Sequence, residues 1–193
     1  MSRILVVSGS PAPASRSLAV SQRMSLALQE SGFVAEMQDV RDMPAQDLVG
    51  WRGESPAVRA AANMIERADG VVLVTPIYNA AYSGALKAFL DVLPQRAFAR
   101  KVVLPVCIAG SPAHLLAIDY ALRPVLASMG DPHVLRGVLL LEASLTRDTA
   151  GAVELDGDSL QRVEAAISDL ARALDYSTYT FTSRTASAVM RKS

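Results

Sequence analysis

Short apolar runs alternate with amphipathic stretches of helical length along most of the chain. Continuous apolar runs bounded by turn residues predict strands that are buried on both faces. These runs lie at 4–7, 71–74, 102–108 and 134–141, and a looser alternation at 33–40 predicts a more exposed strand at an edge. Helical spacing predicts helices over 17–31, 55–68, 83–93, 114–129 and 158–175.

Residues with strong terminal preferences support several of these boundaries. Gly32 stands where a helix C-terminus favours glycine, and Ser55-Pro56 places an N-cap before a proline at the first helical position. Residues 41–54 and 144–157 lack a clear period, so we expect loops there. The hydroxyl-rich residues 176–193 are interpreted as a C-terminal tail outside a single domain of residues 1–175.

Strands alternating with helices imply a parallel sheet that is covered by helices on both faces. Two doubly wound strand orders are compatible with this pattern, 3-2-1-4-5 and 2-1-3-4-5. The second order accommodates five strands in 193 residues and places the weakly apolar second strand at an edge. The predicted fold is therefore α/β, a flavodoxin-like three-layer sandwich with a five-stranded parallel sheet in the order 2-1-3-4-5.

Composition narrows the function classes. Nineteen basic and nineteen acidic residues give no net charge, which argues against a nucleic-acid partner and, with 51% hydrophobic residues, against disorder. The single cysteine, Cys107, excludes an internal disulfide and a cysteine zinc site, and we interpret it as inert core. With two histidines no metal site is predicted, and no apolar run is long enough for a membrane span. We expect a cytoplasmic protein.

In the predicted strand order, ligands bind where the order reverses, beyond the carboxyl ends of the first and third strands. The first loop there, residues 8–17, joins a buried strand to a helix N-terminus and carries four serines and Arg16. Unpaired N–H groups, hydroxyls and a guanidinium suit a phosphate, although an N-cap cluster in a solvated turn has the same composition. The loop lacks GxGxxG and GxxxxGK[ST], so a dinucleotide fold is disfavoured and a P-loop is excluded.

Two further loops, 75–83 and 109–114, lie beside this crevice. Ile77 and two tyrosines in the second loop could form a wall for a flat ring or fill a subunit interface. The small residues of the third loop allow a ligand to approach the backbone. His114 is interpreted as structural, with ligand contact as the alternative, and Trp51 could cover a ligand or a neighbouring subunit.

These loops resemble those of a known family. Residues 9–17 are similar to the phosphate loop of NAD(P)H-dependent FMN reductases, and 75–87 match their T-P-x-Y-x-x-x-x-S-G-x-L-K signature. The stretch 88–122 resembles the reductase component of two-component alkanesulfonate monooxygenase systems. The resemblance covers about residues 3–142. One departure is Ala12, where relatives often have an arginine.

The resemblance implies FMN as ligand, with NADPH or NADH as reductant. Its phosphate would lie at Ser10, Ser15, Arg16 and Ser17, and its ring beside Pro76, Ile77, Tyr78 and Asn79, with Gly110 and Ser111 on the far side. Hydride would pass directly between the two cofactors, so no catalytic side chain is required. Reduced flavin would serve a monooxygenase, with sulfonate sulfur assimilation as the implied role.

Alternatives from other classes are a flavoprotein that retains FMN and reduces quinones, azo compounds or metal oxyanions, and a non-catalytic electron carrier. Such carriers are usually acidic, and the neutral balance of this chain disfavours one. The resemblance also implies a homodimer or homotetramer. Candidate assembly or helix-bulge residues are Tyr82, Lys87, Asp91 and Tyr120, where Tyr120 is expected to widen its helix locally into a π-bulge.

Overall fold

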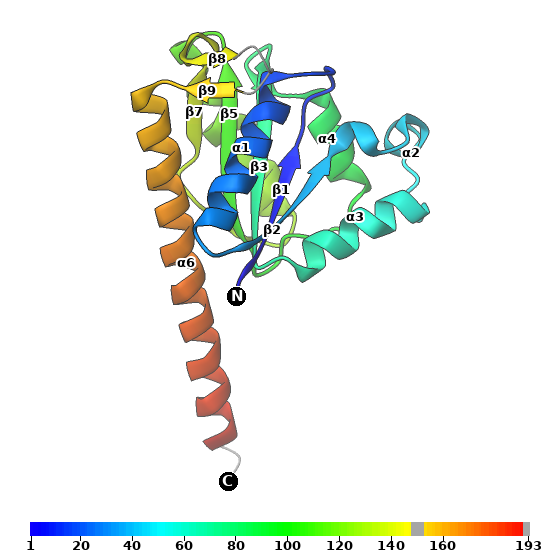
Figure 1. Ribbon diagram of the computed structural model, residues 1–193. Helices are drawn as coiled ribbons and strands as arrows, with labels where there is room; N and C mark the ends of the chain where they lie inside the picture. Colours follow the sequence, from blue (N-terminus) through cyan, green and yellow to red (C-terminus); the bar gives the residue numbers. More distant parts are fainter. Residues whose placement is uncertain (148–152, 191–193) are drawn as a thin grey trace.

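A mostly parallel sheet forms the centre of the molecule (Figure 1). The computed structural model describes residues 1–147 and 153–190, and the side chains of 1–146 and 153–176. The strands of the sheet lie in the order β2-β1-β3-β5, followed by β6 and β7, which both pair with β5. They are β1 (Arg3–Ser8), β2 (Val34–Asp39), β3 (Gly70–Tyr78), β5 (Val102–Ala109), β6 (His133–Val134) and β7 (Val138–Leu141). The predicted flavodoxin-like order is therefore confirmed.

The fifth predicted strand, 134–141, is interrupted and forms β6 and β7. The interruption lies where Gly137 meets Ile118: a Cβ at Gly137 would come within 2.8 Å of the Ile118 side chain. Arg123 donates hydrogen bonds to the carbonyl oxygens of Val134 (2.9 Å) and Leu135 (3.1 Å). At the break, the Arg123 side chain thus supplies hydrogen-bond donors to two carbonyl groups of the strand segment.

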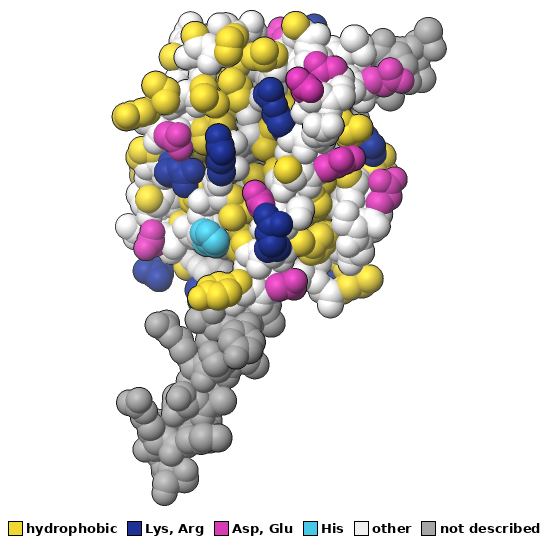
Figure 2. Space-filling view, turned by 90° about the vertical axis from the view of Figure 1, so that its left-hand side faces the viewer, with side chains coloured by type: hydrophobic (Ala, Val, Ile, Leu, Met, Phe, Trp, Pro, Cys, Tyr) yellow, Lys and Arg dark blue, Asp and Glu magenta, His cyan; other side chains and the backbone are white. Residues whose placement is uncertain are grey.

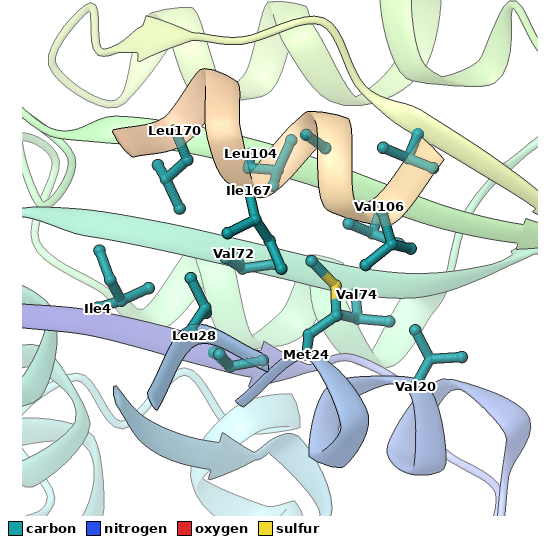
Figure 3. Packing of buried hydrophobic residues seen from close by; sticks show 14 of the residues in the cluster. Ile4, Val20, Met24, Leu28, Val72, Val74, Leu104, Val106, Ile167 and Leu170 are labelled. Carbon is teal, nitrogen blue, oxygen red and sulfur yellow. The ribbon is translucent and has the colours of Figure 1, made fainter. Parts of the chain in front are cut away.

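Helices cover both faces of the sheet (Figure 1). On one face lie α1 (Arg16–Glu30) and α6 (Gly157–Met190), and on the other α3 (Pro56–Arg67), α4 (Gly84–Val92) and α5 (Arg123–Ser128). Figure 3 shows the core on the first face, where side chains of α1 and α6 pack against those of the central strands. Members of this core include Val20, Met24, Leu28, Val72, Val74, Leu104, Val106, Ile167 and Leu170. Their burial explains the continuous apolar runs of the strands.

Serine N-caps begin three of these helices. The side chains of Ser15, Ser55 and Ser83 accept hydrogen bonds from the backbone N–H groups of Leu18, Val58 and Leu86. The helices predicted over 17–31, 55–68 and 83–93 are confirmed as α1, α3 and α4, with each end shifted by one residue. Gly32 follows α1 with a φ of +86°, a conformation that glycine adopts without steric cost.

Both segments that were predicted to be loops contain regular structure. Residues 41–54 include a 3₁₀ turn that begins at Val40 and the five-residue helix α2 (Ala45–Val49), which is too short to show a helical period. Residues 144–157 include the antiparallel strands β8 (Leu145–Arg147) and β9 (Val153–Leu155); residues 148–152 of this segment lie outside the described residues. Leu145 and Val153 are buried in the core, which anchors the hairpin.

The region predicted as one helix over 114–129 forms three consecutive helical segments of different types. A 3₁₀ turn, Pro112–His114, precedes the π-helix η3 (Ile118–Leu122), which continues into α5. The backbone N–H of Arg123 bonds to the carbonyl oxygen of Ile118, five residues back. Pro124 follows directly and has no N–H to donate to Tyr120, which favours the wider turn.

The helix predicted over 158–175 is α6, and it continues to Met190. Its C-terminal part extends beyond the end of the sheet (Figure 1). The expected tail 176–193 therefore begins as a continuation of this helix, and its last three residues lie outside the described residues. Within the described part of the chain, none of the helices combines the length and the apolar character needed to cross a bilayer.

Candidate functional site

The second candidate loop, 75–83, is a β-hairpin, which corrects the predicted end of the third strand at Val74. β3 continues to Tyr78, and β4 (Ala81–Tyr82) returns antiparallel to it. The two connecting residues, Asn79 and Ala80, have φ values of +49° and +62°. Positive φ at both central positions is typical of a type I′ turn. The hairpin therefore holds Tyr78, which is 47% exposed, at the rim of the sheet.

A hydrogen-bond network joins this hairpin to the first candidate loop, residues 8–17. The Ser83 hydroxyl donates to the carbonyl oxygen of Gly9, and the Ser83 N–H donates to the Thr75 hydroxyl (3.1 Å). The Gly9 N–H donates to the carbonyl oxygen of Val74 (2.8 Å). A Cβ at Gly9 would lie 2.8 Å from that of Leu86, so this position requires glycine. The first two candidate loops are thus tied together at one edge of the sheet.

The first loop ends at the N-terminus of α1. Ser15 caps the helix, accepting from the Leu18 N–H (3.0 Å), and the Ser10 hydroxyl accepts from the Ala12 N–H (3.3 Å). Ser10 and Ser17 are both almost fully buried. Ser8, at the last position of β1, has a buried hydroxyl with no hydrogen-bond partner among the described residues. Hydroxyls, free first-turn N–H groups and a guanidinium form a donor set that fits a phosphate.

Arg16 contributes the guanidinium, and it is already paired. Its Nη1 lies 3.4 Å from Oε2 of Glu142, which follows β7 at the same edge of the sheet. Both side chains are about half exposed, so solvent and ligands can reach them. The sequence pattern did not indicate Glu142, because it lies 126 residues from its partner.

The third loop follows β5 and lies beside the hairpin. Ser111 accepts a hydrogen bond from the Ala113 N–H (3.2 Å), whereas no atom approaches a Cβ at Gly110 within 4 Å, which leaves open space there. A hollow of about 400 Å³ separates this loop and the π-helix from the hairpin tip. Its lining residues are Ala80, Ala113, His114, Leu116, Ala117 and Tyr120. Residues of both the second and the third loop therefore line the same hollow.

A larger groove of about 550 Å³ runs along β7 between the third loop and α6. It begins at Pro112, directly after Ser111, and apolar side chains such as Leu139 line it together with the charged residues Arg136, Arg162 and Asp169. Asp169 forms an ion pair with Arg172. Figure 2 views the molecule from the α6 side and shows hydrophobic side chains over the upper part of this face, with basic side chains among them. Such a surface suits a ligand that is partly apolar and carries negative charge.

The assembly candidates of α4 form a small polar cluster. The Lys87 ammonium lies 2.6 Å from Oδ1 of Asp91, and the indole N–H of Trp51 donates to the Asp91 carbonyl oxygen (3.1 Å). Burial and the negative charge of Asp91 raise the pKa of Tyr82. Because Trp51 bonds to Asp91, near the C-terminus of α4, it lies at the opposite end of this helix from Ser83. Tyr120 is 78% exposed on the π-helix.

Two other interpretations from the sequence concern Cys107 and metal binding. Cys107 is buried in β5, and burial raises the pKa of its thiol to about 12, so it stays protonated at neutral pH. Over residues 1–147 and 153–190, no three or more His, Cys, Asp or Glu side chains gather as a possible metal site.

The doubly wound fold and these loops are compatible with a flavin-binding protein, and comparison with known proteins shows the family. The sequence profile of the NADPH-dependent FMN reductase family matches residues 2–145, and the chain belongs to that family. It is an NAD(P)H:FMN oxidoreductase that uses FMN with NADPH, and NADH-dependent relatives are known.

Similar proteins include bacterial enzymes and solved structures. An FMN reductase (NADPH) of Pseudomonas putida is 44% identical over 135 residues, covering 70% of this chain and 68% of that protein. An FMN reductase (NADPH) of Escherichia coli is 40% identical over 136 residues, covering 70% and 71%. The apo crystal structure of the NADH:FMN oxidoreductase EMOB superposes with a TM-score of 0.75 at 35% identity, covering 88% of each chain.

Proposed function

We propose that FMN binds across the three loops, with its phosphate at the N-terminus of α1. Ser10, Ser15, Arg16 and Ser17 would hold the phosphate. The observation that carries this proposal is the convergence of helix N–H groups, serine hydroxyls and one guanidinium on a loop tied to the hairpin. Replacement of Arg16 by alanine should weaken FMN binding by about 1.5–3 kcal/mol and leave riboflavin, which lacks the phosphate, unaffected. Equal effects on both flavins would refute the assignment.

The isoalloxazine ring would lie beside the hairpin residues Pro76, Ile77, Tyr78 and Asn79, with Gly110 and Ser111 on its far side. The rigid two-residue turn and the open space at Gly110 support this placement. FMN supplies the acceptor for the hydride that NAD(P)H delivers, and the protein orients the two ring systems. The residues of this chain therefore bind and position, and none is needed as an acid or base.

For NADPH, we assign the 2′-phosphate to the groove along β7. The groove starts next to the third loop, and Arg136 and Arg162 provide guanidinium groups for a phosphate, whereas the one carboxylate in its lining, Asp169, is paired with Arg172. Substitution of Arg162 by alanine should raise the KM for NADPH several-fold and leave the KM for NADH unchanged. An equal rise for both nucleotides would place the 2′-phosphate elsewhere.

The proposed destination of the reduced flavin is a separate flavin-dependent monooxygenase, with sulfonate sulfur assimilation as the pathway. The chain is 30% identical over 127 residues to the NADH-dependent FMN reductase SfnE of Pseudomonas putida, covering 63% of this chain and 67% of that protein. This similarity supports the proposal. The test couples the enzyme to an alkanesulfonate monooxygenase and measures sulfite release with NADPH and free FMN. Direct reduction of azo dyes without flavin transfer would favour the alternative role, which similarity to an NADPH azoreductase of a Bacillus species suggests.

We also propose that the chain forms a homodimer or homotetramer through Tyr120 and the outer surface of α4, which carries Lys87 and Asp91, with Tyr82 beside it. Exposed Leu115, Leu116 and Tyr120 support an apolar contact on the π-helix side. Tyr120→Asp should lower the mass measured by light scattering, and Leu26→Asp, at an exposed leucine of α1, should not. A cytoplasmic location stays a prediction from the apolar pattern of the sequence.

A further inference from the structure

The only basic residue of the proposed phosphate loop, residues 8–17, shares its charge with a carboxylate. Arg16 Nη1 lies 3.4 Å from Glu142 Oε2, and each side chain is 47% exposed. A guanidinium has five N–H donors, so contact with one carboxylate oxygen leaves donors for a phosphate. Glu142 therefore does not block Arg16, but it keeps a negative charge beside it.

Several hydrogen bonds hold the turn that carries Glu142. The Ser144 hydroxyl donates to the carbonyl oxygen of Leu141 (2.8 Å) and accepts from the Ser159 hydroxyl (3.0 Å). The Asp156 N–H donates to the carbonyl oxygen of Ser144 (3.1 Å). The turn is thus fastened to the start of α6, and the backbone of Glu142 is fixed at the rim of the phosphate loop.

Charge at this rim opposes tight binding of an anion. The carboxylate of Glu142 offsets part of the positive charge of Arg16, so a phosphate that carries up to two negative charges meets less positive charge than Arg16 alone would supply. A carboxylate held next to the cation that contacts the phosphate also repels the phosphate directly. Because both groups are solvent-exposed, this repulsion is moderate and is screened by salt.

We infer that Glu142 sets how weakly the enzyme holds FMN, so that flavin leaves the site readily after reduction. Glu142 is a positioning residue that acts through Arg16 and through its own charge, and it touches no reacting atom. The inference rests on the proposed placement of the phosphate at Arg16. It accounts for a loop that has the donors for a phosphate and yet, under the proposed function, lets the flavin leave.

The test measures FMN and riboflavin dissociation constants of the flavin-free full-length protein by quenching of flavin fluorescence, at low and at high salt. Glu142→Gln keeps the shape of the side chain and removes its charge. Glu154→Gln, at an exposed glutamate of β9, is the matched control. Arg16→Ala reports on the phosphate site separately, and thermal unfolding verifies that each variant is folded.

Glu142→Gln should tighten FMN binding about three- to tenfold at low salt, and added salt should reduce the gain. It should leave riboflavin affinity unchanged, and Glu154→Gln should affect neither flavin. If Arg16→Ala weakens FMN binding while Glu142→Gln leaves it unchanged or weakens it, the phosphate site stands and the inference about Glu142 is wrong. If Arg16→Ala does not distinguish FMN from riboflavin, the phosphate site itself is misplaced.

Discussion

The Ser83 hydroxyl donates a hydrogen bond to the carbonyl oxygen of Gly9, across 74 residues of sequence. The same hydroxyl accepts from the Leu86 N–H (3.0 Å) and so caps α4. One side chain therefore caps the N-terminus of α4 and also fixes the backbone of the first candidate loop, residues 8–17. The buried position of Ser83 excludes water as a substitute partner.

Replacement of Ser83 by alanine should cost about 2 kcal/mol of unfolding free energy, because one buried carbonyl and one helix N–H lose their partner. Urea unfolding measures this loss. FMN affinity should fall as well, since Gly9 is no longer held. Ser55→Ala removes the equivalent cap from α3 and should cost about 1 kcal/mol without affecting FMN. Loss of FMN affinity in both variants would mean that general destabilisation is responsible.

Ala80 is strained at the tip of the hairpin, where its φ is +62°. Ala80→Gly should stabilise the protein by about 1 kcal/mol, because glycine adopts this conformation without steric cost. Ala81, the first residue of β4, offers the contrasting site: glycine there should destabilise. A shift of the urea midpoint in the same direction for both variants would contradict the type I′ turn.

The N-terminus of α6 gives a pH-dependent prediction. The polar side chain and the backbone N–H of Ser159 hold the pKa of Asp156 below its usual value, and the N–H donates to Oδ1 of the carboxylate (2.8 Å). A carboxylate with a lowered pKa in the folded state contributes stability above its unfolded pKa, and this contribution disappears as the pH falls through the folded pKa. Wild type should therefore be more stable than Asp156→Asn at neutral pH, and the difference should vanish in acid. A difference that is independent of pH would show that the charge is irrelevant.

Cys107 should not react with a thiol reagent in the native protein. Only a thiolate is reactive, and burial keeps this thiol protonated and inaccessible. One equivalent of thiol should appear after unfolding in guanidinium chloride. Rapid labelling of the folded protein would show that β5 opens easily.

Burial on both faces made much of the sheet predictable. The apolar run 102–108 became β5, Val102–Ala109, because each side chain in it lies in a core. The break within 134–141 was not predictable, since it depends on contact between Gly137 and Ile118 and on carbonyl bonds from Arg123.

Within the site, local signals located the loops but not their geometry. Ser15 and Ser83 were recognisable as residues before helices, whereas the hairpin was missed because alanine, and not glycine, follows Asn79 in the turn. Contact between Arg16 and Glu142 depends on the tertiary fold, which brings the turn after β7 to the start of α1, and no local pattern encodes it. The continuation of α6 was missed because the serines and threonines after Tyr176 have low helix propensity.

We propose that FMN is an exchangeable substrate of this enzyme as well as its ligand. The most direct test measures NADPH oxidation by protein stripped of flavin, with and without added FMN. We predict little turnover without FMN and a saturable increase as free FMN is added, with reduced flavin accumulating in solution under anaerobic conditions. Full NADPH oxidation that requires no added FMN, with the flavin remaining on the protein, would contradict this account.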